Sequence, residues 1–216
     1  MAAERLQPAP PPAQMSFELT LQTPQQSLPA GGELFFRGDS LLFARIVALM
    51  GLEVARVRLV RDSLEIWDRF NGRIVMLGAR PRQLPFGLAL PEPVRFSPAL
   101  VWTWLSGRDL ARFWSDSARL ELAESEQPSW RGPDVRISLD PTNGLPARLE
   151  RYAGTTLLEE RRYEEWSSWN GAWLPRRILV RRPREGWELV YRLRALSESG
   201  APPEWNPPPQ LPRLRW

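Results

Sequence analysis

The side chains available for chemistry in this sequence are carboxylates, hydroxyls and arginine. All 29 basic residues among the 216 are arginine, and the chain contains no lysine, histidine or cysteine. Without histidine or cysteine there is no zinc finger, haem ligation or iron–sulfur cluster, and without histidine no Ser-His-Asp triad. Without lysine there is no Schiff base and no P-loop lysine. We therefore expect no metal and no cofactor.

Adjacent carboxylates are the remaining candidates for acid–base catalysis. Glu159-Glu160 and Glu164-Glu165 are neighbours in sequence, so on a strand the members of each pair point to opposite faces. Glycoside hydrolysis needs two carboxyls that converge across a cleft, about 5–9.5 Å apart, and the spacing singles out no such couple. The segment 140–144 offers two calcium ligands, but a Pro-Asx-Gly turn explains it fully. We therefore expect no catalytic residue and a protein that is not an enzyme.

Length and composition favour one globular domain. The chain is 43% hydrophobic and 25% charged, which lets it bury a core. Its net charge is only +4 (29 − 25), so we expect no nucleic acid among its partners. Proline is concentrated at the ends, with four residues in 1–14 and six in 201–216. The sequence predicts a Pro/Ala-rich tether over 1–14, a half-barrel domain over 15–200 and a Pro-rich tail over 201–216, which can pack on the domain through Trp205 and Trp216.

Alternation of apolar and polar residues predicts a mainly β domain. Candidate strands are 16–22, 32–37, 40–46, 53–61, 63–69, 73–78, 118–125, 134–139, 145–152, 155–166, 173–183 and 186–195. Three Asn-Gly dipeptides, at 71–72, 143–144 and 170–171, fall between strands and suit the positive-φ positions of type I′ hairpin turns. This pattern is typical of an antiparallel meander.

The hairpin around Asn170-Gly171 can be checked by its charges. If these two residues form the turn, cross-strand partners have residue numbers that sum to 341. Four carboxylates then face arginines: Glu165 faces Arg176, Glu164 faces Arg177, Glu160 faces Arg181, and Glu159 faces Arg182. Such pairs stabilise a hairpin. The basic run 176–184 is thus expected to be a solvated hairpin neutralised by its neighbour, with a phosphate or lipid-headgroup patch as the alternative.

One helix is expected, between Ser97 as N-cap and Gly107 as C-terminal stop, with Pro98 at its first position. It is apolar nearly all the way round, so it is expected to be covered on both sides. Either a ligand or the core lies beneath it. The residues expected to face inward, as a lid, are Leu100, Val101, Trp104 and Leu105. Trp102 points elsewhere and is expected to be covered by segment 80–93 or left partly exposed.

The eleven tryptophans are core residues or line an apolar cavity. Alternation along the candidate strands selects an inward-facing set, which would form the wall of such a cavity. This set is Ala55, Val57, Leu59, Leu64, Ile66, Leu120, Leu122, Val135, Ile137, Trp187, Leu189, Tyr191 and Leu193.

The stretch from Gly38 to Leu77 resembles an uncharacterised family of bacterial lipoproteins whose fold is similar to the carriers LolA and LolB. That family shows a strand, a short GxEaaRv segment, a pDS turn and a hairpin with the sequence drlnk. The matching residues here are Gly51, Glu53, Ala55, Arg56, Asp62, Ser63, Arg69 and Asn71. Arg56 is expected either to pair with Glu53 or to reach the rim of the cavity.

The resemblance implies an open, strongly curved antiparallel half-barrel of about 10–12 strands, with one or two helices plugging its concave face. It also implies the periplasm of a Gram-negative bacterium and a tether to the outer membrane through an N-terminal lipidated cysteine. This chain has no cysteine, so we expect Met1 to replace a removed signal peptide and anchor.

The resemblance therefore implies a non-enzymatic protein that binds lipid or lipoprotein acyl chains. The alternative is a structural or accessory subunit of an envelope assembly, with an envelope protein as partner and no ligand. A carrier keeps an apolar cavity of several hundred Å³ under its helix. A structural subunit fills that space with its own side chains.

Overall fold

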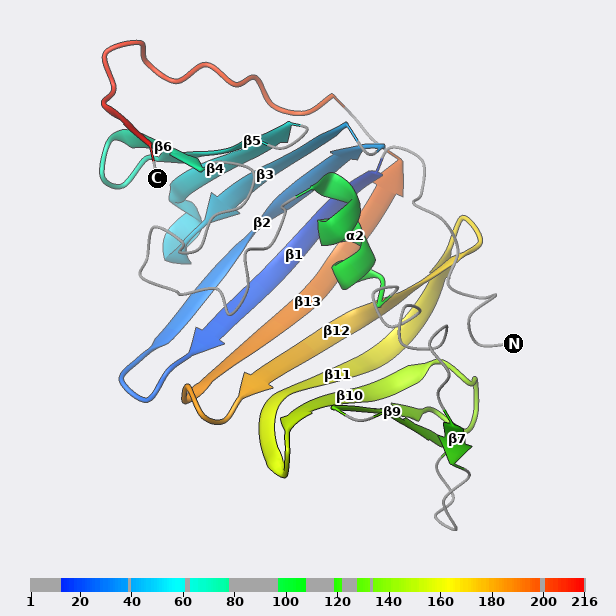
Figure 1. The fold of residues 1–216 in the computed structure, drawn as a ribbon. Helices are drawn as coiled ribbons and strands as arrows, with labels where there is room; N and C mark the ends of the chain where they lie inside the picture. Colours follow the sequence, from blue (N-terminus) through cyan, green and yellow to red (C-terminus); the bar gives the residue numbers. More distant parts are fainter. Residues whose placement is uncertain are drawn as a thin grey trace. The chain divides into compact units, whose positions relative to one another are not determined.

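The computed structural model describes residues 13–38, 40–60, 63–77, 97–107, 119–121, 128–132, 134–198 and 201–215. These residues form fourteen β-strands and one α-helix (Figure 1). The first strands are β1 (Ala13–Gln22), β2 (Ser27–Arg37), β3 (Leu41–Val47), β4 (Glu53–Val60), β5 (Ser63–Asp68) and β6 (Arg73–Leu77), with a short 3-10 helix η1 (Leu49–Gly51) after β3. The helix is α2 (Pro98–Leu105). The later strands are β7 (Arg119–Glu121), β8 (Ser129–Arg131), β9 (Val135–Leu139), β10 (Pro146–Ala153), β11 (Thr156–Trp169), β12 (Ala172–Arg182), β13 (Trp187–Glu198) and β14 (Arg213–Arg215).

The predicted fold class is confirmed. The chain is mainly β, and its strands form a single open sheet that does not close into a barrel. Each of the twelve predicted ranges overlaps an observed strand, and the sequence missed the two short strands β8 and β14. The described pairings are antiparallel, apart from β14, which lies parallel to β6. Because β14 is at an edge, the prolines around it remove no bond from a central ladder.

Two compact units make up the chain. Among the described residues, unit 1 contains 18–29 and 103–193, and unit 2 contains 13–17, 30–102 and 194–215. The strand order in unit 2 is β14-β6-β5-β4-β3-β2, and in unit 1 it is β13-β12-β11-β10-β9-β8-β7.

In unit 2 both faces of the sheet carry buried side chains. One face, here called the helix face, carries Phe36, Leu42, Leu59, Leu64 and Leu77, which lie opposite one another in successive strands. The other face, here called the tail face, is defined by the row Phe43, Arg58, Glu65 and Met76 and the row Arg45, Arg56, Trp67 and Ile74. The helix-face row is at most 7% exposed. On the tail face Phe43, Trp67 and Ile74 are also buried.

In unit 1 the hairpin around Asn170-Gly171 has the predicted register. Trp169 pairs with Ala172 across the two-residue turn, and Glu164 lies opposite Arg177. Asn170 and Gly171 both have positive φ, of 47° and 76°, as a type I′ turn requires. The other two Asn-Gly dipeptides end longer loops, because β5 stops at Asp68 and β9 stops at Leu139.

Candidate functional site

The predicted wall residues of unit 2 share the helix face. Val57 lies opposite Ile66, and Leu59 lies opposite Leu64, so these four side chains are on one side of β4 and β5. Leu59 and Leu64 are buried, whereas Ala55, Val57 and Ile66 are half-buried. None of these five is exposed, as an inward-facing set requires.

Helix α2 begins where the sequence placed it. The Ser97 hydroxyl accepts a hydrogen bond from the Leu100 amide at 3.1 Å, which is an N-cap contact. At the other end Gly107 has a φ of +66° and donates to the Trp104 carbonyl at 3.2 Å. A Cβ at Gly107 would lie 3.1 Å from Cη2 of Trp166, so the helix stop is also a point of close packing.

The side of α2 predicted to face inward is not the buried one. Leu100, Val101 and Trp104 are half-buried, and of the four predicted lid residues Leu105 alone is buried. Trp102 is 2% exposed and packs edge-to-face on Phe36 of the helix face, with ring centroids 5.3 Å apart. The alternative of a partly exposed Trp102 is therefore wrong, and segment 80–93 lies outside the described residues. Because the helix is apolar all round, its sequence could not define which side packs on the sheet.

The predicted wall residues of unit 1 fall into two groups. Val135, Ile137, Tyr191 and Leu193 are buried, and Trp187 and Leu189 are half-buried. Leu120 lies in β7, but its side chain is outside the described set, and Leu122 is outside the described residues. Ile137, Leu149, Arg161, Val180 and Leu189 lie opposite one another in consecutive strands, so this row contains a charged residue.

A buried charge cluster accompanies that row. Glu159 is 3% exposed and accepts hydrogen bonds from Nε of Arg161 at 2.7 Å and Nε of Arg182 at 2.9 Å. Burial raises the pKa of Glu159, but the charges of both arginines outweigh this and lower it below its usual value. The predicted Glu159–Arg182 pair thus exists, but the hairpin is not simply solvated.

Glu160 differs more from its prediction. It lies opposite Arg181 in the register, yet it pairs with Arg148 and Arg162, at 2.8 and 2.7 Å, and is 2% exposed. Arginine stems cover a carboxylate while their guanidinium groups stay near water, which explains how this charge is buried on a polar face.

The resemblance motif forms an ion-pair cluster on the tail face. Glu53 accepts hydrogen bonds from Nε of Arg56 at 2.6 Å, Nη1 of Arg69 at 2.7 Å and Nε of Arg45 at 3.1 Å. Burial raises the pKa of Glu53, but the hydrogen bonds from Arg56 and Arg69 prevail and hold the pKa at about 2. Among the other motif residues, Ser63 is exposed at the start of β5 and Asp62 lies outside the described residues.

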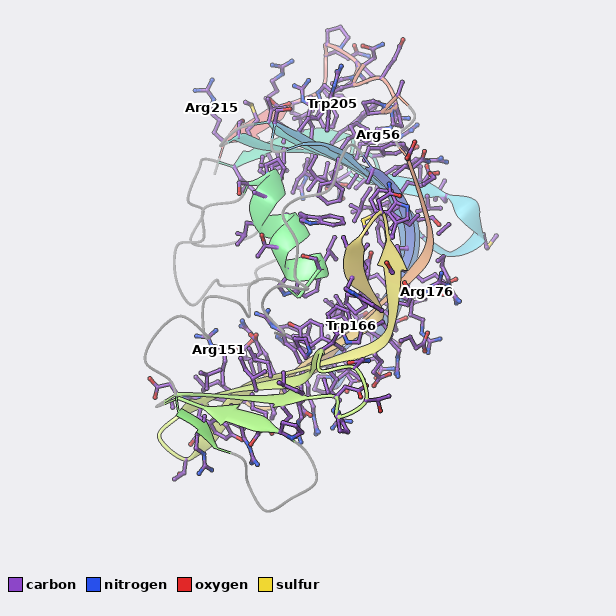
Figure 2. The ribbon with its side chains drawn as sticks, turned by 90° about the vertical axis from the view of Figure 1, so that its right-hand side faces the viewer. Arg56, Arg151, Trp166, Arg176, Trp205 and Arg215 are labelled. Atoms are coloured by element: carbon purple, nitrogen blue, oxygen red, sulfur yellow. The ribbon has the colours of Figure 1, made fainter. Side chains whose placement is uncertain are left out.

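The Pro-rich tail covers the tail face, a contact that the sequence predicted only as an option. Trp205 packs edge-to-face on Phe43 and Trp67, with centroids 6.1 and 6.4 Å apart, and the Arg58 guanidinium lies 4.7 Å from its ring centroid. Arg56 and Trp205 lie on the same side of these strands in Figure 2. The only sequence signal for this site was a tryptophan between two proline clusters.

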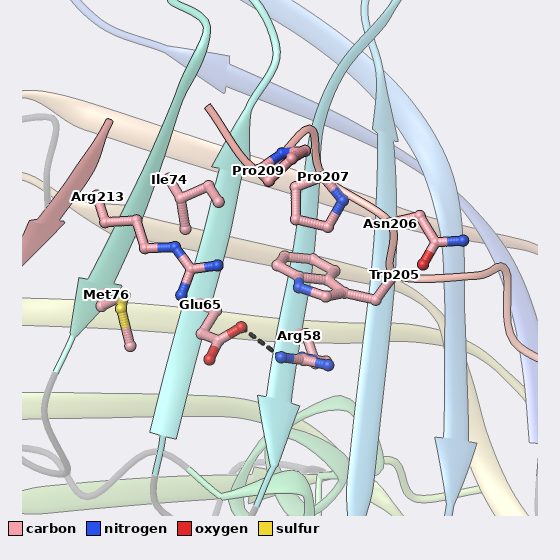
Figure 3. Close-up of a pocket in the computed structure, with 9 residues that line it drawn as sticks. All are labelled: Arg58, Glu65, Ile74, Met76, Trp205, Asn206, Pro207, Pro209 and Arg213. Carbon is pink, nitrogen blue, oxygen red and sulfur yellow. Dashed lines mark hydrogen bonds and ion pairs between the residues drawn. The ribbon is translucent and has the colours of Figure 1, made fainter. Parts of the chain in front are cut away.

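Two hollows flank Trp205. The first, of about 310 Å³, lies between the tail and β4–β6 (Figure 3). It is lined by Arg58, Glu65, Ile74, Met76, Trp205, Asn206, Pro207, Pro209 and Arg213. The second, of about 550 Å³, has Phe43, Leu41, Pro202 and Pro203 among its lining residues. A third, in unit 1, measures about 680 Å³ and is lined by residues such as Arg162 and Trp166.

Apolar side chains are exposed at one end of unit 2. Met50 and Leu52, in the loop before β4, are 102% and 63% exposed, and Phe70, in the loop after β5, is 79% exposed. The two loops are neighbours, because Arg69 donates its amide to the Val54 carbonyl at 2.9 Å. We call Met50, Leu52 and Phe70 the apolar tip.

Two kinds of site are not found among the described residues. No three acidic side chains gather closely enough there to hold a metal ion. No described helix is long and apolar enough to cross a membrane.

Comparison with solved structures identifies the fold. No family model matches the sequence, and no curated protein matches it. A LolA superfamily protein from Nitrosomonas europaea superimposes with a TM-score of 0.56 over 93% of this chain and 91% of its own, at 15% identity. The chain has a LolA-like fold.

Two further solved structures superimpose on most of this chain. A putative outer membrane lipoprotein-sorting protein domain from Vibrio parahaemolyticus gives a TM-score of 0.57 over 93% of this chain and 90% of its own, at 12% identity. A DUF1329 family protein from Desulfovibrio piger gives 0.54 over 87% and 85%, at 10% identity. Identities this low speak for the fold alone, so function has to be argued from the residues.

Proposed function

We propose that this protein binds an apolar ligand, the acyl chains of a lipid or lipoprotein, without catalysing a reaction. We place it in the periplasm of a Gram-negative bacterium, tethered to the outer membrane. The observation that carries the proposal is the LolA-like fold, which it shares along nearly its whole length with a putative outer membrane lipoprotein-sorting domain.

The helix face of unit 2 supports an apolar site. Val57 and Ile66 are half-buried apolar side chains opposite one another, beside the buried pair Leu59 and Leu64. The described residues cover this apolar row only in part. An acyl chain is a better ligand for it than a polar molecule, because contact with the chain would remove these side chains from water.

The apolar tip supports work at a membrane surface. Met50, Leu52 and Phe70 gain nothing from exposure to water, and they lie on two neighbouring loops. Exposed apolar surface of this kind marks interaction sites.

The test is a search for bound lipid. The protein is produced in the periplasm of a Gram-negative host, purified without detergent and weighed by native mass spectrometry. We expect adducts with lipid masses, and binding of a fluorescent fatty acid after delipidation. Val57→Asp should abolish both, whereas Val60→Asp, on the opposite face of the same strand, should not. Wild-type protein that carries no lipid and takes up no fatty acid would contradict the proposal.

A structural subunit of an envelope assembly is the second candidate, and one contact favours it. Trp102 fills space beneath α2 with a side chain of the protein itself, against Phe36. Under this reading the same experiment yields no lipid, and co-purification from the native envelope yields a protein partner instead.

A further inference from the structure

We propose that the tail face of unit 2 is a recognition groove for extended, proline-rich protein segments that carry a tryptophan. Residues 202–215 of the chain itself occupy this groove in cis. The proposal concerns the opposite face from the predicted acyl-chain wall, so it stands independently of lipid binding.

The first argument is the conformation of the occupant. Residues 201–212 contain six prolines and form no strand or helix, which is the state of segments that dock on aromatic grooves. Proline restricts the free segment in advance, so it loses little conformational entropy when it binds. A groove that accepts this segment accepts others of the same chemistry.

The second argument is the anchor. Trp205 meets two aromatic rings, Phe43 and Trp67, and the Arg58 guanidinium lies over its ring. Arg58 is itself held by Glu65, whose Oε2 is 2.6 Å from its Nη2, as Figure 3 shows. A preformed cation beside two rings is a specific receptor for an indole, because the cation–π contact adds to apolar burial.

The third argument is recognition of the backbone at two places. Arg56 donates from Nη1 to the carbonyl oxygen of Glu204 at 2.8 Å, next to the anchor. Farther along, the Ile74 amide donates to the Pro212 carbonyl at 2.9 Å, and β14 adds to β6 with three paired residues. Addition of a strand to a sheet edge is a general mode of peptide binding that reads the backbone, not the side chains.

The fourth argument is that the cis segment fills the groove incompletely. The hollows of about 310 and 550 Å³ remain on either side of Trp205. The side chains of Arg213, Leu214 and Arg215 are all exposed, so β14 is held to β6 by backbone bonds without side-chain burial. A partner segment with larger side chains beside its tryptophan could therefore replace the tail.

A partner segment can enter the groove only by displacing the tail, which is covalently joined to the domain. A tail joined by a short linker is present at an effective concentration of about 1 mM, so it masks the groove from a free peptide of moderate affinity. Substitution of Trp205 should weaken binding of the tail and leave the groove accessible to a free peptide.

The experiment measures a fluorescein-labelled peptide of sequence 201–215 binding to the full chain by fluorescence polarisation. We expect Trp205→Ala and Trp205→Leu to bind it at least about tenfold more tightly than wild type. Trp187→Ala, a tryptophan change in unit 1, should match wild type. Adding Arg58→Gln to Trp205→Ala should weaken binding again, and a peptide with alanine in place of its tryptophan should not bind.

Several outcomes would overturn the proposal. One is equal affinity of wild type and both Trp205 variants for the peptide when circular dichroism shows all of them folded. Another is equal binding of the alanine peptide. Self-association of wild type that is lost in Trp205→Ala would make a second copy the occupant and would contradict a partner protein.

Discussion

Arg56 and Glu53, three residues apart, form a two-point ion pair on the tail face, with Nε 2.6 Å from Oε1 and Nη2 3.3 Å from Oε2. The same guanidinium lies 5.3 Å from the ring centroid of Trp67 and donates to Glu204. Of the two roles that the sequence left open for Arg56, pairing with Glu53 is therefore the one observed.

Arg56→Leu should lower the free energy of unfolding by about 1–3 kcal/mol, because Glu53 and the Glu204 carbonyl both lose a half-buried charged donor. Arg45→Leu is the matched control. Arg45 also bonds Glu53, but it is 41% exposed and should cost less than about 1 kcal/mol. Urea unfolding measures both. If Arg56→Leu keeps wild-type stability and changes lipid retention instead, the residue acts at the ligand.

The pKa of Glu53 sets a pH dependence. It is about 2 in the folded chain against 4.5 ordinarily, so its stabilisation is present above about pH 4.5 and is lost as the pH falls toward 2. Between pH 5 and pH 2, wild type should lose on the order of 2 kcal/mol more stability than Glu53→Gln. Because the chain lacks histidine and cysteine, stability should be nearly constant from about pH 6 to pH 8. Parallel curves for the two proteins in acid would refute this role of Glu53.

Gly107→Ala should destabilise the protein by about 2–3 kcal/mol. It places a Cβ 3.1 Å from Trp166 at a residue whose φ is +66°. Gly38→Ala is the control, since φ there is +56° with nothing within 4 Å, and it should show only the backbone cost of about 1 kcal/mol. Thermal unfolding compares them. Equal losses would mean that Trp166 moves aside freely.

Trp102→Ala should cost about 3–5 kcal/mol, because it empties a fully packed site against Phe36. Trp104→Ala should cost less, because Trp104 is half-buried and its centroid is 5.9 Å from the Arg161 guanidinium. If α2 covers an acyl-chain site, Trp102→Ala should also increase the uptake of a fluorescent fatty acid. A small effect on stability from Trp102→Ala would show that the helix is loosely held.

The apolar tip can be tested with vesicles of phosphatidylethanolamine and phosphatidylglycerol. Changing both Leu52 and Phe70 to serine should reduce co-flotation by at least about a hundredfold, because full burial of each side chain contributes about 1.5–3 kcal/mol. Leu28→Ser is the control, since Leu28 is 45% exposed outside the tip. Equal flotation of all three proteins would remove the tip from membrane contact.

The sequence by itself determined twelve of the fourteen strands, the register of one hairpin and the start of the helix. Strict alternation in β4 predicts which of its residues share a face, because successive side chains on a strand point to opposite sides. Asn170-Gly171 fixed the register of β11 and β12, since only residues that tolerate positive φ form that turn. Ser97 determined where α2 begins by accepting the Leu100 amide.

Tertiary structure decided what covers each face. Arg58 lies under the tail because Trp205 supplies an indole on which its guanidinium group can stack. Arg56 lies there because it donates to the Glu204 carbonyl. Because α2 is apolar all round, its sequence did not specify which side packs inward. In the structure Trp102 is on the inward side, where it contacts Phe36. Glu160 is a buried partner of Arg148 and not of Arg181. The reason is that β10, which carries Arg148, pairs with β11 on the side away from β12. Such choices depend on residues far apart in sequence, which local patterns do not specify.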